Sequence, residues 1–179
     1  MSRSPYFFVE RYNPELEKYE LQHPFVWNGE RNKLVPADLF PYNGAHELFS
    51  IVSQKDYSAY PEMNGIHTGL PNFVCEEISK EYQACIDPNL FPEKAVNAYW
   101  FTYADLYIYL LENPTVKDYA AMDEVWASDP DKEWKNMEAI YTDNPLFTLK
   151  NRIDAFFEVI DDWSWKDNYS LIRIVYWIL

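Results

Sequence analysis

The chain has 179 residues, of which 29 are acidic and 15 are basic, so its formal net charge is −14. A chain of this length is expected to fold as one domain, residues 1–179, whose core needs neither a metal nor a disulfide. Because so strong a negative charge repels phosphate backbones, the composition argues against direct nucleic-acid binding and is compatible with a basic protein partner.

The first part of the sequence predicts a β-hairpin followed by loops. YFFVERY (6–12) and KYELQ (18–22) are typical of strands, and the Asn-Pro pair between them is typical of a turn. Prolines and glycines make most of residues 24–46 a loop. AHELFSIV (45–52) fits either a short helix or a strand.

The middle of the sequence predicts helices that are separated by Asx-Pro pairs. The Asx side chain caps free amides and proline fits the first helical position, so such a pair indicates a helix start. Thr102 and Asp105 have the spacing of a capping box. Apolar spacing and these signals together predict helices over 71–86, 101–112, 114–127, 130–141 and 145–162, the last capped by Asn144.

The end of the chain, YSLIRIVYWIL (169–179), is rich in β-branched and aromatic residues. It is too apolar for an exposed sheet edge, so we expect a buried strand that pairs with the N-terminal hairpin. The predicted fold is therefore α+β, with a small antiparallel sheet of hairpin and C-terminal strand covered by four or five helices.

The cysteines and the apolar runs bear on the cellular compartment. Cys75 and Cys85 both fall in the predicted helix 71–86, where ten residues rise roughly 15 Å, beyond the reach of a disulfide. The run YFFV near the start is too short for a signal-peptide core, and no stretch approaches the ~20 apolar residues of a membrane span. We expect reduced cysteines, a cytoplasmic location and no membrane contact.

Motifs that would carry catalysis or metal binding are missing from the sequence. It contains no HExxH, CxxC or GxSxG pattern and no glycine-rich loop for phosphates. We therefore predict no catalytic residue, no metal and no cofactor. NGIHTGLP (64–71) is a compact loop with two glycines, and loops often carry function. The alternative hypothesis is a small-ligand binder or enzyme with a pocket near His46 and His67.

A first acidic and aromatic segment, KDYAAMDEVWASDPDKEW (117–134), holds six carboxylates and two tryptophans. Helical spacing turns Tyr119, Met122 and Trp126 toward the core. The carboxylates left facing away from the core are those of Asp118, Asp123 and Glu124.

A second such segment is FEVIDDWSWKD (157–167). Asp161 and Asp162 fall at the end of a predicted helix, where the helix dipole disfavours negative charge, and that cost favours a functional reason for them. If both segments lie side by side, they form one anionic face that docks on a cationic groove. The predicted contact residues are Asp118, Asp123, Glu124, Asp161 and Asp162, with Trp163 or Trp165 as anchors.

Two N-terminal stretches, YFFVERYNPELEKYELQHPFVWN and PADLFPYNGAHELFSIV, resemble small uncharacterised proteins from phages and mobile elements of gut Firmicutes. Proteins of that origin include CRISPR inhibitors, several of which are acidic and occupy a groove meant for nucleic acid. The resemblance covers about the first half of the chain and implies no site residue. It implies a non-enzymatic inhibitor that docks on the basic nucleic-acid-binding surface of a defence nuclease. A further hypothesis is a homodimer that pairs through the C-terminal strand.

Overall fold

The structure is a computed structural model that describes residues 5–22, 61, 63–86, 89, 96–129, 131, 137–160 and 168–178. Within these residues the chain has the α+β fold that its sequence predicts, with a five-stranded antiparallel sheet, a separate two-stranded sheet and four α-helices. The predicted loop 24–46 and the unassigned segment 45–52 lie outside the described residues.

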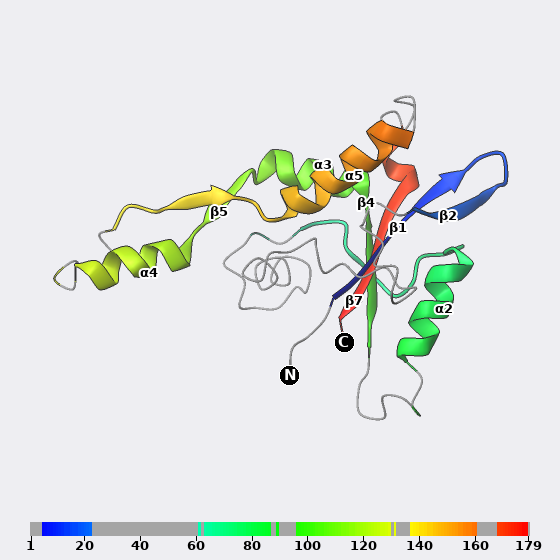
Figure 1. Ribbon diagram of the computed structural model, residues 1–179, viewed down its shortest axis with the longest axis horizontal. Coiled ribbons are helices and arrows are strands. Elements are labelled where there is room, and N and C mark those ends of the chain that lie inside the picture. Colours follow the sequence, from blue (N-terminus) through cyan, green and yellow to red (C-terminus); the bar gives the residue numbers. More distant parts are fainter. Residues whose placement is uncertain are drawn as a thin grey trace.

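The larger sheet has the strand order β2-β1-β7-β4-β3, so the C-terminal strand lies in its middle (Figure 1). Its strands are β1 (Pro5–Asn13), β2 (Lys18–Gln22), β3 (His67–Thr68), β4 (Ala98–Thr102) and β7 (Ile172–Ile178). The helices are α2 (Glu76–Cys85), α3 (Tyr103–Glu112), α4 (Tyr119–Ser128) and α5 (Leu146–Ile160). A 3-10 helix, η4 (Tyr169–Leu171), leads into β7.

Strand β7 is buried because it has a strand on each side and helices over the sheet. The rings of Phe7 and Tyr176 stack at 5.2 Å between centroids, and those of Phe8 and Trp177 at 4.9 Å. The predicted pairing of this strand with the N-terminal hairpin is confirmed. Both edges of β7 are paired inside the chain, with β1 and β4, so neither edge is open to a second copy. A homodimer through this strand is therefore not expected.

The β1–β2 hairpin turns where the sequence predicts it. The Oδ1 atom of Asn13 accepts hydrogen bonds from the amides of Glu15 and Leu16, at 3.0 and 3.3 Å. An Asx side chain that caps its own turn in this way accounts for the sharp reversal, and Glu17 completes it with a positive φ of 51°.

Strand β4 and helix α3 correct the prediction of one helix over 101–112. The first two residues of that range end a strand, and the helix begins at Tyr103. The capping box is confirmed, because the Asp105 amide donates to Thr102 Oγ1 at 3.1 Å and the Thr102 amide donates to Asp105 Oδ2 at 2.9 Å. Local sequence patterns do not predict β4, because its conformation depends on its partner strands, β7 and β3.

Helices α2 and α5 cover opposite faces of the large sheet. On β1, the carboxylate of Glu10 accepts from the amide of Cys75, the N-cap residue of α2. The next residue, Arg11, places its guanidinium 5.6 Å from the ring centre of Phe157 on α5. Since neighbouring side chains of a strand point to opposite faces, the two helices lie on opposite sides.

Helix α3 is tied to α5 by a cluster of polar groups. The Tyr103 hydroxyl donates to one carboxylate oxygen of Asp154, and the Lys150 ammonium lies 2.6 Å from the other. Burial and the Asp154 carboxylate together raise the pKa of Tyr103, so its hydroxyl stays protonated and remains a donor. The cluster fixes the two helices that lead to the α4 region.

The prediction for 71–86 is wrong at its start. Helix α2 begins at Glu76, and Cys75 is its N-cap, so Cys75 is not inside the helix. The helix cannot extend further back because Phe73 has a left-handed backbone, with φ 58°. Cys75 and Cys85 are both buried and neither forms a disulfide, as expected.

The predictions for 114–127 and 130–141 are also wrong in part. Residues Thr115–Lys117 form strand β5, which pairs with β6 (Tyr141–Asp143), and the helix α4 begins only at Tyr119. Residues 137–140 are not helical, while 130 and 132–136 lie outside the described residues. The Asn113-Pro114 pair does not start a helix here, because the residues that follow it form strand β5, which is paired with β6.

Helix α5 confirms the strongest helical pattern of the sequence, over Leu146–Ile160. Asn144 caps it as predicted, with Oδ1 accepting from the Leu146 amide at 3.0 Å. The same side chain donates from Nδ2 to the Asn113 carbonyl at 3.0 Å, so it also joins the end of α3 to the start of α5.

We expect the substitution Asn144→Ala to destabilise the protein by about 1–3 kcal/mol, because it removes a cap and leaves a carbonyl without its donor. Urea denaturation followed by circular dichroism measures the loss. The control is Asn97→Ala at an exposed position, which should change stability little. Equal effects of the two substitutions would contradict the bridging role of Asn144.

Candidate protein-binding surface

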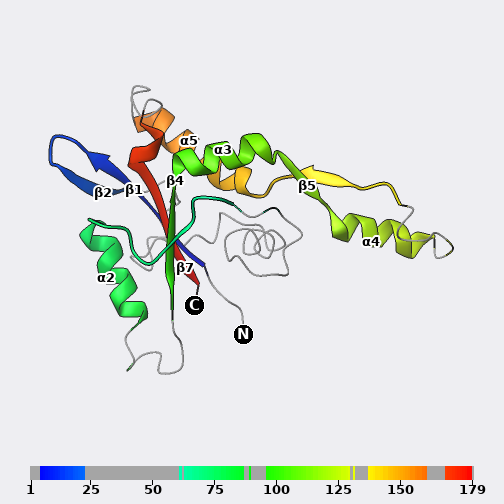
Figure 2. The same cartoon turned by 180° about the vertical axis from the view of Figure 1, so that it is seen from behind.

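A two-stranded ribbon and one helix project from the body of the protein, as Figures 1 and 2 show. We call β5, α4 and β6 together the acidic arm. The ribbon pairs Val116 with Thr142, and Val116 is buried. At its two ends the Asp118 amide donates to the Ile140 carbonyl at 2.8 Å, and the Asn144 amide to the Pro114 carbonyl at 3.0 Å. These bonds hold α4 away from the large sheet.

Asp118 begins the helix of the acidic arm. Its Oδ1 atom accepts a hydrogen bond from the Ala121 amide at 2.8 Å, so the carboxylate serves as the N-cap of α4. The sequence predicts Asp118 as a partner contact, and the structure gives it a local role in addition. A negative charge there is favoured by the helix dipole.

The exposed face of α4 is wider than the sequence predicts. Of the three residues expected to face the core, only Met122 is buried. Tyr119 and Trp126 keep 41% and 44% of their surface exposed, so the prediction is wrong for these two rings. Helical spacing places the three on one side, but α4 lies away from the large sheet (Figures 1 and 2). Both rings are therefore available at the surface together with the carboxylates.

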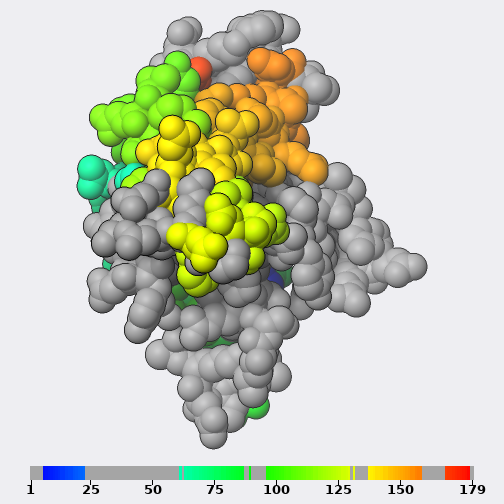
Figure 3. Space-filling model, turned by 90° about the vertical axis from the view of Figure 1, so that its left-hand side faces the viewer, coloured from blue at the N-terminus to red at the C-terminus, as the bar shows by residue number. Residues whose placement is uncertain are grey.

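Acidic side chains are exposed on the same helix as these rings. Asp123 and Glu124 are exposed on α4, as predicted from the sequence. Residues 112–143 contain nine acids and three bases, a net charge of −6 within 32 residues. Figure 3 views the molecule from the side of the acidic arm and shows the α4 side chains, in yellow-green, at the surface. The acidic arm is thus a projecting anionic surface that also carries aromatic rings.

The second predicted contact segment lies outside the described residues. This applies to Asp161, Asp162, Trp163 and Trp165. Helix α5 follows β6 directly and runs away from the acidic arm for 15 residues, about 22 Å, before it ends at Ile160 (Figures 1 and 2). The described residues therefore give no support for one continuous face made of both segments.

The alternative site near the histidines gains no support from the described residues. His67 lies on β3, exposed, and its ring stacks on Trp100 at 4.2 Å between centroids. His46 lies outside the described residues. Across the described ranges, no three His, Cys, Asp or Glu side chains form a group that could hold a metal. A helix that could cross a membrane is likewise not found among the residues described.

The environment of Cys75 makes its thiol unreactive. Burial, with the Glu10 and Glu77 carboxylates, raises the pKa of the Cys75 thiol to about 12, although its hydrogen bond to the Ile78 amide acts in the opposite direction. The nucleophile is the thiolate, which becomes tenfold rarer for each pH unit below the pKa. Cys75 is therefore a packing residue.

We expect Cys75 to react with a soluble disulfide reagent at pH 8 roughly a thousandfold more slowly in the folded protein than in urea, because its thiolate is scarce and buried. Stopped-flow absorbance of a Cys85→Ser variant isolates this thiol. The thiol of Cys85 in a Cys75→Ser variant is the matched comparison. Fast labelling of folded Cys75 would contradict the assignment.

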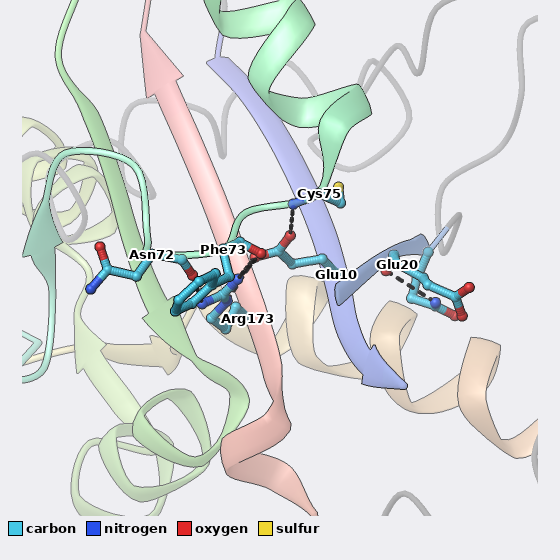
Figure 4. A network of polar contacts seen from close by, with 7 residues as sticks. Glu10, Glu20, Asn72, Phe73, Cys75 and Arg173 are labelled. Carbon is cyan, nitrogen blue, oxygen red and sulfur yellow. Dashed lines mark hydrogen bonds and ion pairs between the residues drawn. The ribbon is translucent and has the colours of Figure 1, made fainter. Parts of the chain in front are cut away.

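The centre of the sheet holds a buried ion pair between Glu10 and Arg173 that the sequence did not predict (Figure 4). Glu10 on β1 is fully buried and Arg173 on β7 nearly so. The Arg173 Nε donates to Glu10 Oε1 at 2.6 Å, and the guanidinium lies 3.3 Å from the ring centre of Tyr19. Burial raises the pKa of Glu10, while the Cys75 amide and Arg173 act to lower it. The available signals were the one charge of β7, Arg173, and Glu10 directly after the apolar run of β1.

We expect Glu10→Leu and Arg173→Met each to cost about 3–5 kcal/mol, since each leaves a buried charge without its partner. The double variant Glu10→Leu/Arg173→Met should cost clearly less than the sum of the two single losses. Urea denaturation of all four proteins gives the coupling. Additive losses would show that the pair does not act as a unit.

Comparisons with protein-family models, with curated proteins and with solved structures find no match to this chain.

Proposed function

We propose that this protein is a non-enzymatic binder of a basic protein surface, and that the acidic arm is its contact. The observation that carries the proposal is the composition of the exposed surface of α4, which extends round most of the helix. Asp123 and Glu124 are exposed there, Trp126 and Tyr119 are half exposed, and Met122 is the only buried residue of that helix. Carboxylates and rings together are what a cationic protein groove selects.

The charges of the acidic arm suit the approach of a partner. A net charge of −14 on the chain and −6 within residues 112–143 gives a field that attracts a basic surface from a distance. An exposed ion pair contributes little to affinity by itself. The carboxylates therefore act mainly on the rate of association and on the choice of partner.

The rings supply the affinity that exposed charges do not. Tryptophan and tyrosine are the residues most often found at the energetic centre of an interface. On α4 the Trp126 ring keeps 44% of its surface exposed beside acidic neighbours. Covering that surface removes apolar area from water, and the carboxylates form a polar rim around it. Trp126 is thus the proposed anchor.

The class of partner follows from the N-terminal resemblance to phage and mobile-element proteins. We propose that the partner is a nucleic-acid-binding nuclease of a bacterial defence system and that the protein inhibits it in the manner of a CRISPR inhibitor. An acidic arm on the nuclease would occupy the surface that nucleic acid needs. The missing catalytic motifs are consistent with inhibition by occupancy.

The proposal predicts that Asp123→Lys/Glu124→Lys lowers affinity for the partner at least tenfold, because two attractive charges become repulsive. Trp126→Ala should lower it roughly thirtyfold, the effect of losing an anchor worth about 2 kcal/mol. The partner is the protein retained from a host lysate at low salt and released at high salt. Binding is then measured with the purified partner, and nuclease cleavage is followed with and without the chain.

The matched control is Glu15→Lys/Glu17→Lys, which changes the charge by the same amount in the exposed β1–β2 turn. It should leave affinity within about twofold. A separate Asp161→Lys/Asp162→Lys variant tests whether the second predicted segment contributes. Unchanged affinity of the Asp123/Glu124 variant would remove the acidic arm from the interface, and undiminished cleavage by the bound nuclease would remove inhibition.

A further inference from the structure

The loop of residues 64–71 begins with an asparagine that is followed by a glycine. Asn64 and Gly65 form a turn, and both are exposed. Gly65 has a φ of 89°, a conformation that glycine adopts readily because it has no Cβ atom. Among the described residues, none forms a hydrogen bond with the Asn64 side chain or with the Gly65 amide. Both groups that flank this peptide bond are therefore open to water.

An exposed Asn-Gly pair can lose ammonia without an enzyme. The Gly65 nitrogen attacks Cγ of Asn64, a nitrogen–carbon bond forms, and the side-chain nitrogen leaves as ammonia with the proton of the Gly65 amide. Water then opens the five-membered imide at one of its two carbonyls. The hydroxyl of the water stays on that carbonyl carbon, which becomes a carboxylate, and a hydrogen returns to the Gly65 nitrogen. No oxidant or reductant is needed.

The residue after the asparagine controls how readily the ring closes. The attack is intramolecular, so it depends on how easily the nitrogen reaches Cγ, and a glycine puts no side chain in the way. Asn72 and Asn97 are also exposed, but the residues that follow them, Phe73 and Ala98, carry side chains. These two asparagines are therefore expected to react more slowly and are comparison sites within the same molecule.

Gly65 also packs against the carboxylate that caps α3. A Cβ atom at Gly65 would lie 2.7 Å from Cγ and Oδ1 of Asp105, closer than non-bonded atoms approach. Asp105 Oδ2 accepts from the Thr102 amide at 2.9 Å and from Thr102 Oγ1 at 2.7 Å. Ring opening toward isoaspartate adds one methylene to the backbone just before this contact, together with a second negative charge. Both changes act against the capping box.

We propose that Asn64 is a site of spontaneous covalent modification, and that its conversion to isoaspartate loosens the capping box at the start of α3. The co-reactant is water, so the extent of conversion follows the age of the molecule. Aged molecules then differ from fresh ones in the stability of this helix, independently of what the acidic arm binds.

The first test measures conversion in the folded full chain at pH 8 and about 37 °C. Peptide mapping by mass spectrometry locates the gain of about 1 Da, and electron-transfer fragmentation separates isoaspartate from aspartate. We expect conversion at Asn64 at least tenfold faster than at Asn72 and Asn97, with isoaspartate present. An equal rate at the three sites, or a rate at Asn64 more than tenfold lower in the folded chain than in urea, would overturn the proposal.

The second test measures the consequence by differential scanning calorimetry of fresh and aged protein. We expect Tm to fall by about 2–4 °C once Asn64 is converted. The control is Asn64→Gln, aged in parallel, because a glutamine must close a larger ring and does so far more slowly. This variant keeps Asn28 and Asn43, which also precede glycines and lie outside the described residues, so it separates their effects. Equal falls in both proteins, or no fall in the converted chain, would overturn the link to α3.

Discussion

Two opposite charges buried side by side determine how the central strands line up. Glu10 on β1 and Arg173 on β7 are direct partners in the sheet register. A shift of β1 by one residue against β7 would move Glu10 to the other face and leave Arg173 buried without its partner, at a cost of several kcal/mol. Desolvation offsets much of the attraction within such a pair, so its main contribution here is the choice of one register over its neighbours. The ends of the hairpin and the start of α2 follow from that choice.

The acidic arm depends on different interactions. Its strands have three residues each, and its frame rests on Val116, on the backbone bonds at the two ends of the ribbon and on the double role of Asn144. None of these involves the exposed side of α4. The positions of Asp123 and Glu124 are therefore under little structural constraint, and charge can accumulate there with small effect on the fold. That separation of fold and surface is what a binding module requires.

Local signals in the sequence predicted the parts of the fold that local chemistry controls. The sequence predicted the capping box at Thr102, the cap at Asn144 and the apolar C-terminal strand, because each of these depends on residues close in sequence. The short strands β4, β5 and β6 were not, since their conformation comes from partners. The Glu10–Arg173 pair joins residues 163 positions apart, which no periodicity reveals. Spacing showed that Trp126 shares a side with Met122, but not whether anything covers that side.

The carboxylates and the rings of the acidic arm act through forces of different range. Exposed carboxylates on a projecting arm act across roughly a Debye length, about 8 Å at physiological salt, and they weaken as salt rises. An apolar ring acts only on contact, through the removal of its surface from water, and salt hardly screens it. A partner of the acidic arm would be attracted by the carboxylates and retained by the rings.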